Sequence, residues 1–361
     1  MQTRLDRLRA IMAGRGLPAL LVSAPANRRY LSGFTGSSGA LLITPERALL
    51  ITDSRYTLQA TREAPDFAVH ELINPGRPLP AVLKAAAAEQ GLTQIGFEAA
   101  FVTVAEHRAL ADALAGVAEL VPLEGLVEQL RVVKEADELA ILRRAIAITD
   151  AAFAATLPRL RPEMSEREAA WMLEVALRIG GAEALSFPII VAAGPNGALP
   201  HATPGDEPLG SGRPIVIDMG ARVAGYHADL TRTVVLGEAD ERFWQIYDIV
   251  LEAQRRAIAG MRPGIHTHAV DALARDYIGS RGFGEQFGHG LGHGVGLDVH
   301  EGPGLRRALP DAPPVALQPG MVTSVEPGIY LEGWGGVRIE DLVLVTSEGA
   351  TVLSQAPKLR S

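Results

Sequence analysis

Residues 215 to 235 read Ile-Val-Ile-Asp-Met-Gly-Ala-Arg-Val-Ala-Gly-Tyr-His-Ala-Asp-Leu-Thr-Arg-Thr-Val-Val, and this stretch decides the fold of the second half of the chain. Two runs that are apolar or alternating, 215–221 and 226–235, predict two strands joined by a turn near 223–225. Each strand carries one acid, Asp218 or Asp229, and a hairpin places these acids almost opposite each other, with Cβ atoms about 5 Å apart. Either one acid is protonated, or a multivalent cation lies between them, which removes the cost of desolvation more completely.

An acid within an apolar run occurs twice more towards the end of the chain. Glu326 ends the apolar run 321–326, and Glu340 lies inside the apolar run 337–346. A single acid in such a run is more often salt-bridged or placed on an edge strand than bound to a metal. Four acids in four apolar runs, however, indicate a shared cation site.

The stretch Gly-His-Gly-Leu-Gly-His-Gly-Val-Gly, residues 288–296, lies between the two pairs of acids. Glycine costs about 1 kcal/mol in a helix interior, so the stretch is expected to be loop or strand and not a zinc-binding helix. Taken alone, it is as consistent with a glycine-rich turn carrying two incidental histidines as with a site. The four acids favour the site, to which this stretch brings a histidine framed by glycines.

The charge of this set indicates how many ions it holds. Four carboxylates and one neutral imidazole carry −4, which two divalent cations neutralise. Such a dinuclear centre, with its ions about 3.5–4 Å apart, activates water and polarises a carbonyl oxygen, which is the equipment for hydrolysis. Ligands that are mostly oxygen favour Mn²⁺ or Co²⁺, with Zn²⁺ or Fe²⁺ as alternatives.

Composition sets the broad class of the protein. The chain has 361 residues, of which 47% are hydrophobic and 21% charged, and this is typical of a globular protein with two domains. A formal net charge of −8 makes nucleic acid and anionic membranes poor partners. The chain contains no cysteine, which excludes disulfides and thiolate metal sites. No signal peptide or apolar run of membrane-spanning length is found, so we expect a cytoplasmic protein.

The pattern of elements divides the chain near residues 122–128. Before this boundary, helices expected near 5–15, 79–90 and 104–114 alternate with strands near 19–23, 40–44, 48–52 and 94–97, as in a small α/β domain. After it come two long helices, 138–157 and 165–179, the second opened by a Ser165/Glu168 capping box. Strands and two further helices, 241–259 and 269–280, follow, which indicates an α+β domain. We therefore predict domains at 1–128 and 129–361.

The residues then carry a resemblance to a known family. The motifs IDMG, HADLTRT, GHGVGLDVHE, SVEPGIY and VRIEDLVLV, in this order, resemble the pita-bread metallopeptidases, and among them the proline peptidases: Xaa-Pro aminopeptidase (aminopeptidase P) and prolidase. The resemblance covers about residues 130 to 350. NRRYLSGFTGS and TDSRY resemble the creatinase-type first domain, which argues against methionine aminopeptidase.

The resemblance implies roles for individual residues and a pita-bread fold for the second domain. It implies a homodimer and two metal ions, most simply Mn²⁺, held by Asp218, Asp229, His293, Glu326 and Glu340. Glu326 is the expected proton acceptor. His201 and His300 are expected to contact the substrate, with His289 as a third active-site histidine, Arg338 beside a metal ligand and Tyr330 in substrate binding. His70, His107, His266 and His268 are expected to be structural, and His227 is given no role.

The expected substrate is a peptide with proline in second position, cleaved at the Xaa-Pro bond. Prolidases tend to carry an arginine soon after the Val-His-Glu segment, which can pair with the carboxylate of a dipeptide. Gly304 stands at about this place, so we favour the aminopeptidase, although Arg306 and Arg307 lie close by. The alternatives are the dipeptidase (prolidase), a non-catalytic binding protein with the same fold, and a metal-free creatinase-type amidinohydrolase.

Overall fold

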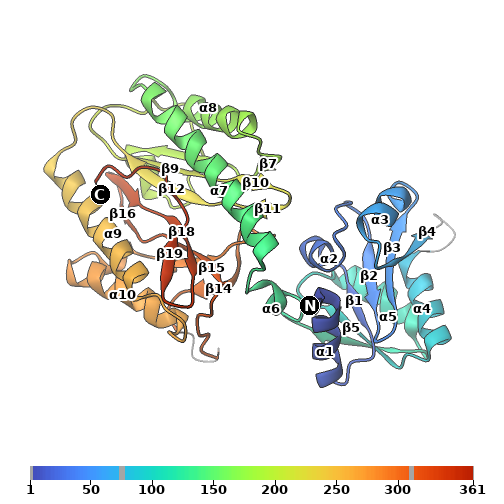
Figure 1. The fold of residues 1–361 in the computed structure, drawn as a ribbon. Coiled ribbons are helices and arrows are strands. Elements are labelled where there is room, and N and C mark those ends of the chain that lie inside the picture. Colours follow the sequence, from blue (N-terminus) through green and yellow to red (C-terminus); the bar gives the residue numbers. More distant parts are fainter. Residues whose placement is uncertain (1–2, 73–77, 309–312, 361) are drawn as a thin grey trace. The chain divides into compact units, whose positions relative to one another are not determined.

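The structure, a computed structural model, describes residues 3–72, 78–308 and 313–360 and divides into two compact units, 1–131 and 132–361. Both units combine helices with sheets, as Figure 1 shows, so the α+β class expected from the sequence is confirmed. The boundary expected after residue 128 lies at the first residue of α6 (Glu128–Arg131), which belongs to the first unit. No helix among the described residues is long and apolar enough to cross a membrane.

The first unit is built on one sheet with strand order β4-β3-β2-β1-β5-β6. β1 pairs antiparallel with β2, and β2 with β3, whereas the pairs β3-β4, β1-β5 and β5-β6 are parallel. The strands are β1 (Leu20–Val22), β2 (Ala40–Ile43), β3 (Ala48–Asp53), β4 (Ala68–Leu72), β5 (Gln94–Glu98) and β6 (Glu119–Leu123). The hairpin expected at 40–52 is therefore confirmed.

The helices of this unit include two that the sequence pattern did not predict. α2 (Pro25–Ser32) and α3 (Thr57–Glu63) span only eight and seven residues, which is too short for apolar periodicity to reveal them. The other helices are α1 (Arg4–Gly14), α4 (Leu79–Gln90), α5 (Val104–Leu114) and the short α6 at the end of the unit. α4 and α5 begin and end at the expected residues.

The second unit places small sheets between two pairs of helices (Figure 1). Apolar side chains of α7 (Ala136–Thr156) and α8 (Glu166–Ile179) share one core with the sheet β12-β9-β8. Those of α9 (Glu241–Gly260) and α10 (Thr267–Ser280) share a second core with the sheet β14-β13-β15-β18-β19. The capping box that opens α8 is present, because Ser165 and Glu168 exchange hydrogen bonds.

The strands of the second unit are mostly short, and the functional side chains lie near their ends. They are β7 (Ala184–Leu185), β8 (Ile190–Ala193), β9 (Ile215–Met219), β10 (Ala221–Val223), β11 (Tyr226–His227), β12 (Leu230–Val234), β13 (Gly292–Gly294), β14 (Glu301–Leu305), β15 (Val322–Val325), β16 (Gly328–Leu331), β17 (Gly335–Arg338), β18 (Asp341–Val345) and β19 (Ala350–Val352). The turn between β10 and β11 is Ala224-Gly225, and both residues have positive φ, which suits a tight hairpin.

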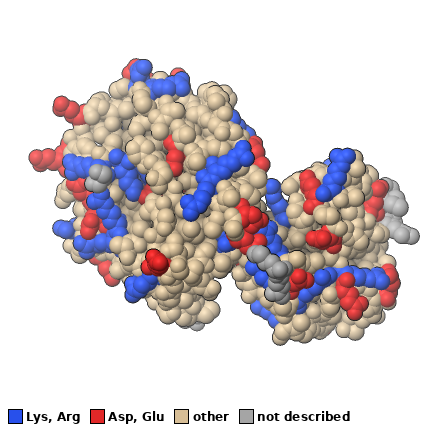
Figure 2. All heavy atoms as spheres, in the orientation of Figure 1, with Lys and Arg blue, Asp and Glu red and all other residues tan. Residues whose placement is uncertain are grey.

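Charged side chains are mixed on the surface. On the face drawn in Figure 2, Lys and Arg lie among Asp and Glu on each of the two units.

Candidate active site

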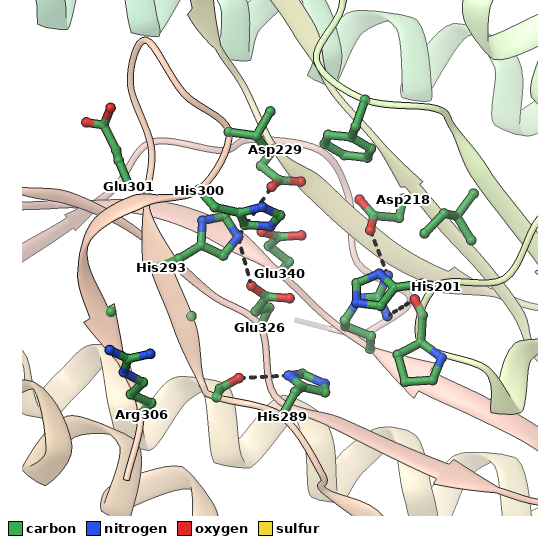
Figure 3. A pocket seen from close by; sticks show the side chains of 18 of the residues that line it. His201, Asp218, Asp229, His289, His293, His300, Glu301, Arg306, Glu326 and Glu340 are labelled. Atoms are coloured by element: carbon green, nitrogen blue, oxygen red, sulfur yellow. Dashed lines mark hydrogen bonds and ion pairs between the residues drawn. The ribbon is translucent and has the colours of Figure 1, made fainter. Parts of the chain in front are cut away.

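Two of the four predicted acids come from the antiparallel pair β9 and β12 of the sheet β12-β9-β8. Asp218 lies in β9, and Asp229 directly precedes β12. The register differs slightly from the expected one, because Asp218 pairs with Thr231 and not with Asp229. The two acids are therefore diagonal neighbours. The turn, Ala224-Gly225, is centred closer to Asp229 than the turn expected at 223–225. Both carboxyl groups still line one cavity (Figure 3).

The other two acids come from the second sheet. Glu326 follows β15 directly, and its N–H donates to the Leu291 carbonyl at 2.8 Å. The run 337–346 is not one strand as expected, because β17 pairs with β16 whereas β18 pairs with β15. Glu340 lies at the break between them, and its N–H donates to the Thr231 carbonyl at 3.0 Å. This bond joins the two sheets at the site.

His293 approaches the acids from the short strand β13. Its Nδ1 lies 3.0 Å from the Gly294 carbonyl, which leaves Nε2 as the free nitrogen when Nδ1 carries the proton. Nε2 lies 3.2 Å from Glu326 Oε1 and 3.6 Å from Asp229 Oδ2. The glycine-rich stretch is thus loop and strand, as expected, and it brings one ring nitrogen into the cluster of acids.

The cluster has the donor atoms that a pair of divalent cations requires. Ligand atoms of Asp229, His293 and Glu340 all lie within 4.8 Å of one another. Three buried carboxylate oxygens have no hydrogen-bond partner among the described residues: Asp218 Oδ1, Asp229 Oδ1 and Glu340 Oε1. A buried acceptor without a partner is costly unless a cation binds it. The residues therefore fit a metal centre.

The pKa values of two of these acids also fit a cation site. Burial, reinforced by the Glu340 and Asp218 carboxylates, raises the pKa of Asp229 well above its ordinary value. Burial, together with the charges of Glu326 and Asp218, does the same to the pKa of Glu340. Without a cation, the protonated forms of these two acids are favoured, because burial and the neighbouring like charges both disfavour the ionised forms. A divalent cation reverses this preference.

Glu326 behaves differently from the other acids. Burial alone would raise its pKa, but the hydrogen bond from His293 and the charges of His293 and His289 outweigh burial and hold the pKa below its usual value. Ser324 Oγ donates to Glu326 Oε1 at 2.9 Å and accepts from the His293 N–H, also at 2.9 Å. The buried Ser324 hydroxyl thus fixes both residues. Its position two residues before an acid on a strand was the only signal for it in the sequence.

A cavity of about 790 Å³ opens onto this cluster. His201, His289 and His300 line it together with all five predicted metal ligands, and Figure 3 shows these side chains around one space. His201 and His300 are exposed to the cavity, and the His300 ring lies 4.2 Å from that of His293, centre to centre. Phe187, Pro188 and Ile190 form an apolar wall that the sequence did not predict.

Arg338 connects the cluster to the rest of the cavity wall. Its guanidinium group donates to Asp218 Oδ2 at 2.7 Å, to the Tyr330 hydroxyl at 2.9 Å and to the Pro200 carbonyl at 3.1 Å. Tyr330 in turn lies 2.9 Å from Nε2 of His289. The residues predicted to lie near the metal ligands are therefore linked by hydrogen bonds.

Thr231 is a further residue that the sequence did not single out. Its hydroxyl donates to Glu340 Oε2 at 2.7 Å and accepts from Arg338 Nε at 3.0 Å. The side chain is fully buried, so these two bonds orient a carboxylate of the cluster. The signal was available as a threonine two residues after Asp229, on the same strand face.

Comparisons with known proteins agree with this geometry. The model of metallopeptidase family M24 matches residues 140–347, and that of the creatinase/prolidase N-terminal domain matches residues 4–133. A solved Xaa-Pro dipeptidase from Bacillus anthracis is 41% identical over 98% of both chains, with a TM-score of 0.93. A solved X-Pro aminopeptidase from Thermotoga maritima is 38% identical over 99% of this chain and 98% of its own, with a TM-score of 0.89.

A comparison of sequences also finds a similar proline peptidase. The Xaa-Pro dipeptidase of Pyrococcus horikoshii is 32% identical over 99% of this chain and 98% of its own length. The two family models together span most of the chain, and the first coincides with the unit that holds the cluster of acids. The chain belongs to metallopeptidase family M24 and carries a creatinase/prolidase N-terminal domain.

Proposed function

We propose that this protein is an Xaa-Pro dipeptidase that hydrolyses the peptide bond before a C-terminal proline. The sequence favoured the aminopeptidase, but the comparisons support the dipeptidase better, since relatives of that name match the chain over nearly its whole length. The observation that carries the proposal is a cationic side chain, Arg306, in the lining of the same cavity as the metal-binding cluster.

The proposed metal ligands are Asp218, Asp229, His293, Glu326 and Glu340, all in the cavity lining. Two divalent ions bound there would polarise the scissile carbonyl and lower the pKa of water. We propose Mn²⁺ as the native ion, with Co²⁺ or Zn²⁺ as alternatives, because the ligands are mainly carboxylate oxygens. The homodimer and the cytoplasmic location stay predictions.

Three side chains are proposed to handle protons and the developing charge. The carboxylate of Glu326 is ionised at neutral pH and is proposed to take a proton from the attacking water. His201 and His300 are exposed in the cavity and are proposed to donate hydrogen bonds to the substrate carbonyl oxygen as it gains negative charge. Burial lowers the pKa of His300, so its ring is neutral near pH 7 and still has one N–H to donate.

Selectivity for proline needs a surface that recognises a ring. The Xaa-Pro amide has no N–H, so a hydrogen bond to the peptide nitrogen cannot select proline. Phe187, Pro188 and Ile190 supply an apolar wall in the same cavity as the cluster of acids. We propose that the proline ring packs against this wall.

Arg306 is placed to bind the carboxylate of a dipeptide. Its side chain lies beside two glycines, because an added Cβ at Gly290 would lie 3.2 Å from Arg306 Cβ and one at Gly304 would lie 3.6 Å from Arg306 Nε. It is exposed and has no hydrogen bond or ion pair with the described residues. A guanidinium group pairs well with a carboxylate. Gly304 thus leaves room for an arginine two residues later.

The aminopeptidase is the second candidate. Gly302 and Gly304 line the cavity on β14 and offer no side chain that would stop a longer peptide. The similarity to the X-Pro aminopeptidase from Thermotoga maritima also favours this activity.

Steady-state kinetics on Ala-Pro and Ala-Pro-Ala separate the two activities. We expect the Mn²⁺-loaded protein to prefer Ala-Pro, and Arg306→Met to raise KM for Ala-Pro about 10- to 100-fold, because a hydrogen bond to a charged group contributes about 1.5–3 kcal/mol. KM for Ala-Pro-Ala should change much less.

Arg307→Met is the matched control. Arg307 is the next residue, is also exposed, and lies outside the cavity lining. Its loss should leave both KM values within about twofold. Turnover of Ala-Pro-Ala alone would overturn the dipeptidase in favour of the aminopeptidase.

A further inference from the structure

The glycine-rich stretch that carries His289 and His293 is held in place from outside by helix α10. Glycines at 288, 290 and 292 have no side chains to pack, and they leave the backbone many conformations. The position of the His289 ring therefore depends on contacts that other elements make with this stretch. α10 makes these contacts through Asp271 and Arg275.

The contacts are hydrogen bonds to backbone groups of alternate residues. Arg275 donates to the Phe287 carbonyl at 2.9 Å and to the His289 carbonyl at 2.7 Å. Asp271 Oδ1 accepts from the Leu291 N–H at 3.0 Å. Three consecutive odd-numbered residues are thus tied to one face of α10.

The two α10 residues also hold each other. Arg275 donates to both carboxylate oxygens of Asp271, at 2.7 and 2.8 Å. The side chain of Asp271 is 2% exposed and that of Arg275 is 11% exposed. A buried bidentate pair of this kind has a fixed geometry, unlike an exposed pair at the same i, i+4 spacing.

Ring contacts extend the connection to the His289 imidazole. The Arg275 guanidinium lies 4.2 Å from the centre of the Phe287 ring, and this ring meets that of His289 edge-on at 5.1 Å. His289 then contacts Tyr330, which binds Arg338. The backbone of Leu291 gives a second connection from α10 to the cluster of acids, because the Leu291 carbonyl accepts a hydrogen bond from the N–H of Glu326.

We propose that Arg275, fixed by Asp271, is a positioning residue that sets where the His289 imidazole lies in the cavity. The expected effects on kinetics rest on the proposed function. Neither residue lines the cavity. A lysine at 275 keeps the charge but cannot donate to two carbonyls and a carboxylate in the same plane.

A double-mutant cycle tests whether Arg275 acts through His289. We expect Arg275→Met to lower kcat/KM for Ala-Pro about 10- to 100-fold with metal content unchanged, as is common when a supporting residue is lost. In a His289→Ala background the same change should cost less than about twofold. Arg275→Lys should recover only part of the loss. Independent effects that multiply would overturn the proposal.

Arg256→Met is the matched control. Arg256 forms an i, i+4 ion pair with Glu252 on α9 and lies 4.1 Å from the Tyr277 ring centre. Among the described residues, it has no hydrogen bond, ion pair or ring contact with the glycine-rich stretch. Its loss should leave kcat/KM within about twofold. An equal loss of activity in this variant would show that removing any such pair is enough, and would also overturn the proposal.

Hydrogen exchange provides a measurement that does not depend on activity. In Arg275→Met and Asp271→Asn we expect faster exchange of the Leu291 amide and its neighbours than in wild type and in Arg256→Met. If the wild-type protein turned over no Xaa-Pro peptide, the proposed function would fail while this measurement still tested the positioning role. Unchanged exchange at Leu291 in both variants would reject that role. Should Arg275→Met fail to fold, Arg275→Lys and Asp271→Asn carry the same comparison.

Discussion

At the scale of single residues, the site is defined by acids that are costly to bury. Asp218, Asp229 and Glu340 each leave one buried oxygen without a partner among the described residues. Apolar side chains in these positions would stabilise the fold more than unpaired charges do. Bound cations or protonation of the carboxyl groups would each lower this cost, so the stability of the protein should depend on metal and on pH together.

The pH dependence has a definite sign. A carboxyl group whose pKa is raised on folding, such as Asp229 or Glu340, binds more protons in the folded chain than in the unfolded chain. The stability that these two groups contribute to the metal-free protein therefore falls as the pH rises from about 4, the unfolded value, towards the raised values. The raised pKa of His293 acts in the same direction. Glu326 acts oppositely, but the contribution from its lowered pKa is complete above about pH 4.5.

We therefore expect Mn²⁺ to stabilise the protein more at pH 8 than at pH 5. Calorimetry with Mn²⁺ and with a chelator should show a Tm difference that grows with pH, because each unit of pKa difference corresponds to about 1.4 kcal/mol. Asp229→Asn should flatten the pH dependence of the metal-free Tm. A Tm difference that is constant from about pH 5 to 8 would contradict this expectation.

At the scale of elements, the strands that carry the proposed ligands approach each other closely at β13. A Cβ added to Gly292 would lie 2.1 Å from the Ser324 carbonyl oxygen, on the neighbouring strand β15. This backbone atom cannot move aside without shifting Glu326, two residues further along. The glycine-rich stretch thus serves packing between strands as well as access to the cavity.

Glycine substitutions should accordingly differ within this one stretch. Gly292→Ala should destabilise the protein by about 1–3 kcal/mol or more, as overpacking does, and should reduce activity. Gly288→Ala is the control, because an added Cβ there meets no atom within 4 Å, and its effect should stay within about 0.5 kcal/mol. Urea denaturation measures both. Equal effects would mean that flexibility, and not close approach, explains the glycines.

At the scale of the whole molecule, the sequence predicted the class of the fold better than its connections. Helices with regular apolar spacing, such as α4 and α5, were predicted to the residue. The strand break at Glu340 was missed because apolar residues continue on both sides of it, and only pairing with different partners divides β17 from β18.

The cluster of acids could be predicted because a charged residue within an apolar run can be recognised in the sequence alone. The residues of α10 that hold the neighbouring glycine-rich stretch could not be predicted in this way. Asp271 and Arg275 look like an ordinary surface pair on a helix, and only the folded chain shows that they hold a loop from another part of the sequence. Arg306 was noticed, but only the structure shows that it reaches the cavity lining.

The central claim is that this cluster of acids binds the metal ions that hydrolyse an Xaa-Pro bond. The most direct test compares the Mn²⁺-loaded wild type, the chelated protein and Asp218→Asn on Ala-Pro, with circular dichroism to verify the fold. We predict turnover by the loaded wild type, loss of turnover on chelation, and a fall of at least about 100-fold in Asp218→Asn with the fold retained. Substantial turnover by a folded Asp218→Asn variant, or by the chelated protein, would contradict the claim.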